Sequence, residues 1–189
     1  RRRTTRGRGH RVPAGVMTGL QDNILWEVLD ECGLPADLRV LVERWHAICG
    51  GPVFDLDRMG FGPLTGHLST SRTTLVELPD DPWVSGLDSR FIYYSRDFDL
   101  YGNASLLGLP FGAHPDRPLS DLSVGSYLDV LDAGRPLFHR ARLTVSRRPG
   151  AFVKCSFPIS RGGRISRILT VSRSLPASGC PSATRSESL

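Results

Sequence analysis

The chain of 189 residues has little of what metal centres and membrane anchors require. Its four cysteines form no C-x-x-C pair, and their spacing matches no zinc-binding pattern. No apolar run approaches the ~18–20 residues that a membrane-spanning helix needs. Unpaired, widely spaced cysteines are typical of reducing compartments. We therefore expect a cytoplasmic protein with no metal site and no membrane contact.

Sequence motifs of common enzymes are also missing. The chain has no G-x-S-x-G nucleophile elbow, no P-loop and no dinucleotide-binding fingerprint. We assign no catalytic and no cofactor-binding residues and expect no enzyme, and the cofactor, if there is one, is unknown.

Acidic residues are absent from one long stretch. Residues 135–173, here called the basic stretch, carry ten basic side chains and no acid. Residues 22–132, the acidic stretch, hold eighteen acidic residues against seven arginines. The two stretches either dock on each other or leave the basic one to bind a partner, nucleic acid included.

The N-terminal part of the chain predicts helices. Apolar residues recur at helical spacing over residues 20–32 and 36–49, and more weakly over 55–68. We expect these helices to form an N-terminal helical extension, residues 17–69. Residues 1–16, rich in Arg, Gly and Thr, predict a disordered basic arm or a non-native extension.

The remaining chain predicts a five-stranded sheet with helices in its middle. β-Branched and aromatic runs indicate strands over residues 72–78, 89–96, 136–146, 151–159 and 165–173. Helical patterns cover residues 99–107 and 121–133. The predicted fold class is α+β, with a polar, disordered tail over residues 175–189.

This order of elements resembles a PAS domain over residues 70–174. In that fold a helical segment crosses between the second and third of five antiparallel strands. Three motifs are similar to those of bacterial stand-alone PAS-like proteins of uncharacterised function and similar length: LVERWHAICGGPVFDLD, FIYYSRDFDLYGNASLLGLPFG and Gly134-Arg135-Pro136. Arg96-Asp97 departs from the Gly-Thr pair that the group tends to show after its second strand.

The resemblance implies a sensory or regulatory module of bacterial signalling that binds a small ligand or a protein. Two alternatives stay open. One is a nucleic-acid-binding protein that uses the basic C-terminal sheet, and the other is a small-molecule-binding α+β enzyme.

Candidates for a ligand pocket come from the face that lines the cavity of a PAS domain. His139 alternates onto the apolar face of its strand, and several aromatic side chains can line a small apolar cavity. The pocket candidates are Tyr93, Tyr94, Tyr127, His139 and Phe157. The alternative is that all five simply complete the core.

The opposite face of the sheet predicts an interface. By alternation, aromatic and basic side chains of the strands predicted over residues 136–146 and 151–159 share one face. That face can receive the predicted helix over residues 20–32, can bind nucleic acid, or can stay solvated. We favour the docking of a helix. This helix can belong to the same chain, to the second copy in a homodimer, or to another protein. The interface candidates are Leu25, Leu29, Trp45, Phe138, Arg140, Arg142, Phe152 and Lys154.

Overall fold

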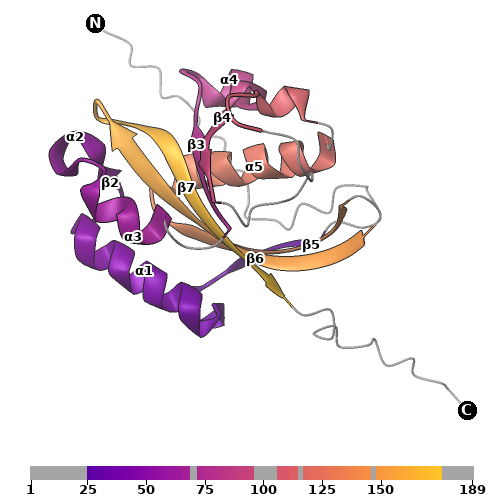
Figure 1. Ribbon diagram of the computed structural model, residues 1–189, viewed down its shortest axis with the longest axis horizontal. Helices are drawn as coiled ribbons and strands as arrows, with labels where there is room; N and C mark the ends of the chain where they lie inside the picture. The colour runs from indigo at the N-terminus through magenta and orange to yellow at the C-terminus, as the bar shows by residue number, and fades with distance from the viewer. Residues whose placement is uncertain (1–24, 69–71, 96–105, 115–116, 146–147, 176–189) are drawn as a thin grey trace, which may run out of the picture.

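The structure, a computed structural model, describes residues 25–68, 72–95, 106–114, 117–145 and 148–175. It is a mixed α+β fold with one largely antiparallel sheet and helices on both of its faces (Figure 1). The strands are β1 (Leu25–Leu29), β2 (Phe54–Asp55), β3 (Thr73–Glu77), β4 (Arg90–Tyr94), β5 (Leu137–Val145), β6 (Arg148–Arg161) and β7 (Arg164–Leu175). The α-helices are α1 (Ala36–Cys49), α2 (Leu56–Met59), α3 (Thr65–Leu68), α4 (Pro82–Ser85) and α5 (Arg117–Ala133).

The sheet has the strand order β1-β5-β6-β7-β3-β4. Neighbours in this order pair antiparallel, and the short β2 lies parallel beside β6. The five strands predicted from the sequence are present as β3 to β7. The described part of the sheet has seven strands rather than five, because β1 and β2 join it. The segment predicted as a helical extension therefore contributes strands as well as helices.

The helix predicted over residues 20–32 is wrong in its described part, since Leu25–Leu29 forms strand β1. β1 pairs with β5, so that Glu27 lies opposite Arg140 and Leu29 lies opposite Phe138. So short an apolar pattern fits a helix or a strand equally well. The edge of β5 would otherwise present a row of unpaired backbone groups, and pairing along that edge decides for the strand.

Helix α1 is confirmed at its predicted bounds, Ala36–Cys49. It ends at Gly50, whose φ of 61° is in the left-handed region that glycine adopts without strain. Its apolar stripe lies on one face of the sheet (Figure 1). The buried residues of the stripe are Leu38, Leu41, Val42, Trp45 and Cys49.

The third predicted helix, residues 55–68, is wrong as a single element. The structure has α2, a 3-10 turn and α3 in its place. Asp55 begins α2, because its carboxylate accepts hydrogen bonds from the backbone N–H groups of Asp57 and Arg58 at 3.1 and 3.3 Å. Gly60, with a φ of 64°, follows its last residue. The glycines in this segment divide the helix.

Helix α5 confirms the helix predicted over residues 121–133 and begins earlier, at Arg117. It lies on the face of the sheet opposite α1 (Figure 1). The helix predicted over residues 99–107 lies outside the described residues except at its end, where Leu107 forms a bridge with Phe91. The predicted disordered ends also lie outside the described residues, apart from Leu175.

The two faces of the sheet differ in polarity. Toward α1, the buried side chains of the sheet are apolar apart from Thr73: Leu75, Phe138, Val153, Cys155, Phe157, Ile159, Leu169 and Val171. Toward α5, the same strands bury polar groups (Thr74, His139, Lys154, Ser156 and Thr170) among apolar ones (Val76, Leu137 and Ile168). The strand register aligns these polar residues, because His139 pairs with Lys154 and Thr170 pairs with both Ser156 and Thr74.

The single face predicted for the aromatic and basic residues of β5 and β6 is wrong. Phe138 pairs with Cys155 and therefore lies on the α1 side, together with Arg140 and Arg142. Phe152 and Lys154 lie on the α5 side, where both line a cavity. Alternation shows which residues of one strand share a face. It does not show how two paired strands are aligned, and a shift of one residue in their register moves every side chain of one strand to the opposite face.

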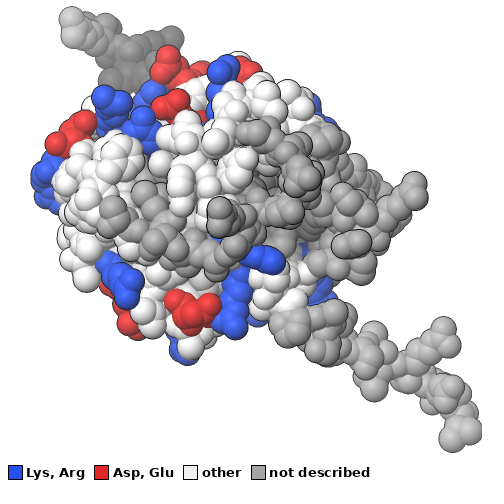
Figure 2. All heavy atoms as spheres, in the orientation of Figure 1, with Lys and Arg blue, Asp and Glu red and all other residues white. Residues whose placement is uncertain are grey.

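The basic and acidic stretches dock on each other within the chain. Among the described residues, five of the ten bases form ion pairs with the acidic stretch: Arg140–Glu27 (3.2 Å), Arg161–Asp57 (3.9 Å), Arg164–Asp80 (2.8 Å), Arg167–Glu77 (3.1 Å) and Arg173–Asp37. Basic and acidic atoms lie interspersed on the face shown in Figure 2. Each exposed pair contributes at most about 1 kcal/mol, so their main effect is to balance charge.

Trp45 holds α1 against the apolar face of the sheet. Its side chain is fully buried, and its ring centroid lies 4.7 Å from that of Phe157 and 5.8 Å from that of Phe54. The sequence predicted Trp45 as an interface residue, but it lies in the chain's own core.

We expect Trp45→Ala to lower the free energy of unfolding by about 3–5 kcal/mol, because it leaves a cavity between α1 and β6. Trp83→Ala is the matched control, because Trp83 is 60% exposed on α4, and should cost less than about 1 kcal/mol. Urea denaturation of both variants measures the difference. Equal losses for the two tryptophans would show that α1 does not pack as described.

Candidate ligand-binding site

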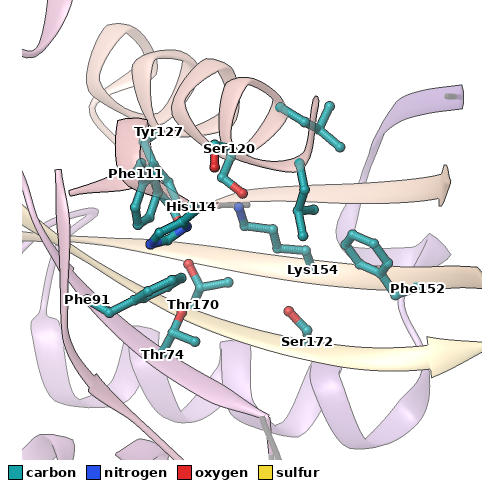
Figure 3. A pocket seen from close by; sticks show the side chains of 13 residues that line it. Thr74, Phe91, Phe111, His114, Ser120, Tyr127, Phe152, Lys154, Thr170 and Ser172 are labelled. Atoms are coloured by element: carbon teal, nitrogen blue, oxygen red, sulfur yellow. The ribbon is translucent and has the colours of Figure 1, made fainter. Parts of the chain in front are cut away.

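A small cavity of about 50 Å³ lies between α5 and the polar face of the sheet. Four rings, those of Phe91, Phe111, His114 and Tyr127, line one part of it (Figure 3). The rings of Phe91 and His114 stack with their centroids 5.5 Å apart and an interplanar angle of 10°. They give the cavity a flat, apolar wall.

Hydroxyl groups line the rest of the cavity. Thr74, Thr170 and Ser172 come from β3 and β7, and Ser120 comes from α5. Figure 3 shows these side chains on both sides of the space, with the sheet below and α5 above. Buried hydroxyls are ordinarily hydrogen-bonded, and those of Ser120 and Thr170 interact with other groups of the chain. The hydroxyls and the ring wall together give the cavity both polar and apolar surface, and we take it as the candidate binding site.

Lys154 provides the cation of the cavity. It extends from β6 toward α5 and is 5% exposed (Figure 3). Its Nζ donates a hydrogen bond to Ser126 Oγ at 2.7 Å and lies 4.2 Å from the centroid of the Tyr127 ring. Both partners belong to α5, so the amine joins that helix to the sheet.

Burial changes the protonation of this amine. Loss of hydration lowers the pKa of Lys154 from its ordinary value of 10.5 to about 7, although the Asp129 carboxylate partly opposes the shift. Charged and neutral forms of Lys154 are therefore both populated near neutral pH. A small change in the charge around the amine changes the balance between them.

The neighbouring titratable groups are also perturbed. Burial and then the Lys154 charge lower the pKa of His139 to about 3, so this histidine is neutral at physiological pH. Its Nε2 lies 3.9 Å from the carboxylate of Asp129. Burial raises the pKa of Asp129, and Asp132 adds to the effect. Burial raises the pKa of the Tyr127 phenol, which stays neutral.

The structure brings some of the predicted pocket residues together and separates others. Tyr127 lines the cavity, and His139 is buried beside Lys154 in the strand register. Tyr94 packs in the apolar cluster on the same side of the sheet. Tyr93 and Phe157 lie on the other side, in the core beneath α1.

The predicted interface residues lie mostly inside the chain. Phe138 is buried beneath α1, and Leu29 packs against the same core. Arg140 pairs with Glu27, as the docking hypothesis expects, although from a strand rather than a helix. The backbone of Arg142 pairs with that of Leu25, whose side chain is not described.

Sequence reasoning missed the role of Lys154, although one signal was available. The chain has twenty-four basic residues, of which twenty-three are arginine, and Lys154 is its only lysine. Arginine stays charged in any environment, whereas lysine changes its pKa readily when it is buried. A single lysine within an apolar strand therefore indicates a buried amine that can lose its proton, unlike the arginines of the surface.

The chemistry of the site favours anion binding. An ammonium group beside several hydroxyl donors can hold a carboxylate or a similar anion. In the described ranges, no three His, Cys, Asp or Glu side chains come together in a way that could hold a metal ion. Among the helices described, none has both the length and the apolar character to cross a bilayer.

Comparison with protein-family models, curated protein sequences and solved structures finds no match to this chain.

The burial of the Lys154 amine should make stability depend on pH. The unfolded chain binds more protons than the folded chain between about pH 7 and pH 10.5, so the wild type gains stability as the pH rises through this window. Lys154→Met keeps the apolar stem and removes the charge. We expect this variant to be more stable than the wild type by roughly 2 kcal/mol at pH 6, with a gap that narrows toward pH 9.

Urea denaturation at several pH values measures this gap. Arg161→Met is the control, because its side chain is 64% exposed and its loss should change stability by the same small amount at each pH. A gap between wild type and Lys154→Met that does not vary with pH would contradict a buried, titrating amine.

Proposed function

We propose that this chain is a PAS-like sensory or regulatory module of bacterial cytoplasmic signalling, and that it binds a small molecule in the cavity beneath α5. One observation carries the proposal: a lysine and several hydroxyls are buried together on one face of a sheet whose other face, apart from Thr73, is apolar at its buried positions. The apolar face suffices to hold a helix. Burial of the Lys154 amine costs stability, and a bound anion would compensate for that cost.

The arrangement of elements supports the PAS-like part of the proposal. Strands β3 to β7 are antiparallel neighbours in one sheet, and the segment between β4 and β5 includes α5. That segment covers one face, and the cavity lies under it. A helical crossover between the second and third of five strands is the feature on which the resemblance rests. Helix α1 and strands β1 and β2 are additions to that core.

The polar contacts suggest how a ligand could be sensed. Lys154 on β6 contacts Ser126 and Tyr127 on α5. A ligand that recruits the amine competes with these contacts and changes how α5 rests on the sheet. A ligand shifts such an equilibrium only by its difference in affinity for the two arrangements, and contact with Lys154 gives it that difference.

Binding, rather than catalysis or nucleic-acid recognition, is the function proposed. A nucleic-acid partner would need the basic stretch for its phosphates, and half of those bases pair with carboxylates of the same chain. A protein partner or a homodimer stays a prediction from the sequence.

The proposal predicts that filling the cavity abolishes small-molecule binding. Ser172→Leu places an apolar side chain in the lining, whereas Ser174→Leu changes an exposed residue two positions further along the same face of β7. We expect at least one member of a panel of neutral, anionic and cationic molecules of up to about five non-hydrogen atoms to bind the wild type and Ser174→Leu, and to bind Ser172→Leu at least tenfold more weakly.

Chemical shifts of backbone amides in β6, β7 and α5 during titration measure the binding. If no molecule of the panel binds, or if Ser172→Leu binds as tightly as the wild type, the cavity is not a ligand site and the proposed function is wrong.

A further inference from the structure

The charged group in the described lining of the cavity is a cation. Among the described residues that line it, Lys154 carries the amine and none is Asp or Glu. The nearby carboxylate of Asp129 is outside the lining, and its side chain is 56% exposed at the rim. A ligand that enters this space therefore meets a positive centre from β6 with no negative centre beside it in the described lining.

Hydroxyl groups surround the same space. The side chains of Thr74, Ser120 and Thr170 are 2%, 2% and 3% exposed. The hydroxyl of Thr170 interacts with the phenol of Tyr127. Figure 3 shows the Lys154 side chain and these hydroxyls around one space beneath α5. Each O–H can donate to an anionic oxygen, so the cavity can hold the two oxygens of a carboxylate from more than one side.

The size of the cavity restricts the ligand. Its volume is about 50 Å³, and one water-sized sphere takes about 10–15 Å³ on this measure. The space therefore fits roughly three to five non-hydrogen atoms. Haem, flavin and nucleotides need sites of at least about 300 Å³. The rings of Phe91 and Phe111 provide apolar contact for a short carbon chain.

We propose that the ligand of this site is a short-chain monocarboxylate of about three to five non-hydrogen atoms, with its carboxylate on Lys154 and its carbon chain against Phe91 and Phe111. This inference rests on the proposed function and names the class of ligand. A single ammonium balances one negative charge. A phosphate or a sulfate carries more charge and is better matched by several cations or by arginine.

The groups around Lys154 predict the pH dependence of binding. Asp129 and Tyr127 face it from α5, His139 lies beside it on β5, and His114 lies across the cavity. Tyr127 and His139 are neutral at physiological pH, and burial alone lowers the pKa of His114. Because a carboxylate favours the charged form of Lys154, affinity should fall as the pH rises through about 7.

The test compares two probes of equal size on the full chain. Propanoate and propanamide both have five non-hydrogen atoms and differ in charge. We expect propanoate to shift the backbone amide signals around Lys154 and Thr170 saturably, and to bind at least tenfold more tightly than propanamide. Its affinity should fall about tenfold between pH 6 and pH 8.5.

Lys154→Met should bind propanoate at least tenfold more weakly than the wild type, whereas Arg161→Met should bind it as the wild type does. The wild-type comparison of the two probes decides the matter even if Lys154→Met does not fold. Equal affinity for the two probes, or propanoate binding that survives in a folded Lys154→Met, would overturn the inference.

The outcome also separates this inference from the proposed function. If only neutral or cationic molecules bind, and if Ser172→Leu abolishes their binding, the ligand class is wrong and the ligand site stands. If no molecule binds the wild type, both are wrong.

Discussion

Neighbouring residues of β6 point to opposite faces of the sheet, so Cys155 packs beneath α1 while Lys154 lies beneath α5. The pairing of β6 with β5 and β7 extends this division across the sheet, since Phe138 joins Cys155 and Thr170 joins Ser156. The apolar face binds α1 tightly and supplies stability. That stability lets the other face keep buried polar groups, which a fold with a single core could not easily tolerate.

The cationic side chains also differ in their location, at the surface or in the interior. Arginines of the basic stretch lie mostly at the surface, where carboxylates from earlier in the chain pair with them. These pairs add little stability individually, but they connect the C-terminal strands to segments far away in the sequence, such as β1 and α1. Among the described residues, the cation with a buried side chain is Lys154, whose amine can lose its proton when it is buried.

Parts of this structure could be predicted from the sequence, and the reasons are physical. Helix α1 and strands β5 to β7 have patterns long enough to separate a period of 3.6 from a period of 2, whereas the five-residue strands β3 and β4 were predicted from their β-branched and aromatic residues. Strand β1 has only five residues, and its conformation depends on the edge of a distant strand. Of the predicted pocket residues, Tyr127 and His139 lie on the cavity side, whereas Tyr93 and Phe157 lie in the core beneath α1. Lys154 was assigned to the wrong face because strand register cannot be read from alternation alone.

The protonation of Lys154 in the ligand-free protein tests the account most directly. Because the chain contains one lysine, labelling of lysine with ¹³C at the ε-carbon gives a single signal, whose chemical shift against pH reports the pKa of the amine. An amine buried between α5 and the sheet predicts a pKa of about 7. A pKa near the ordinary value of 10.5 would show that the amine is solvated, and would contradict both the buried polar face and the site built on it.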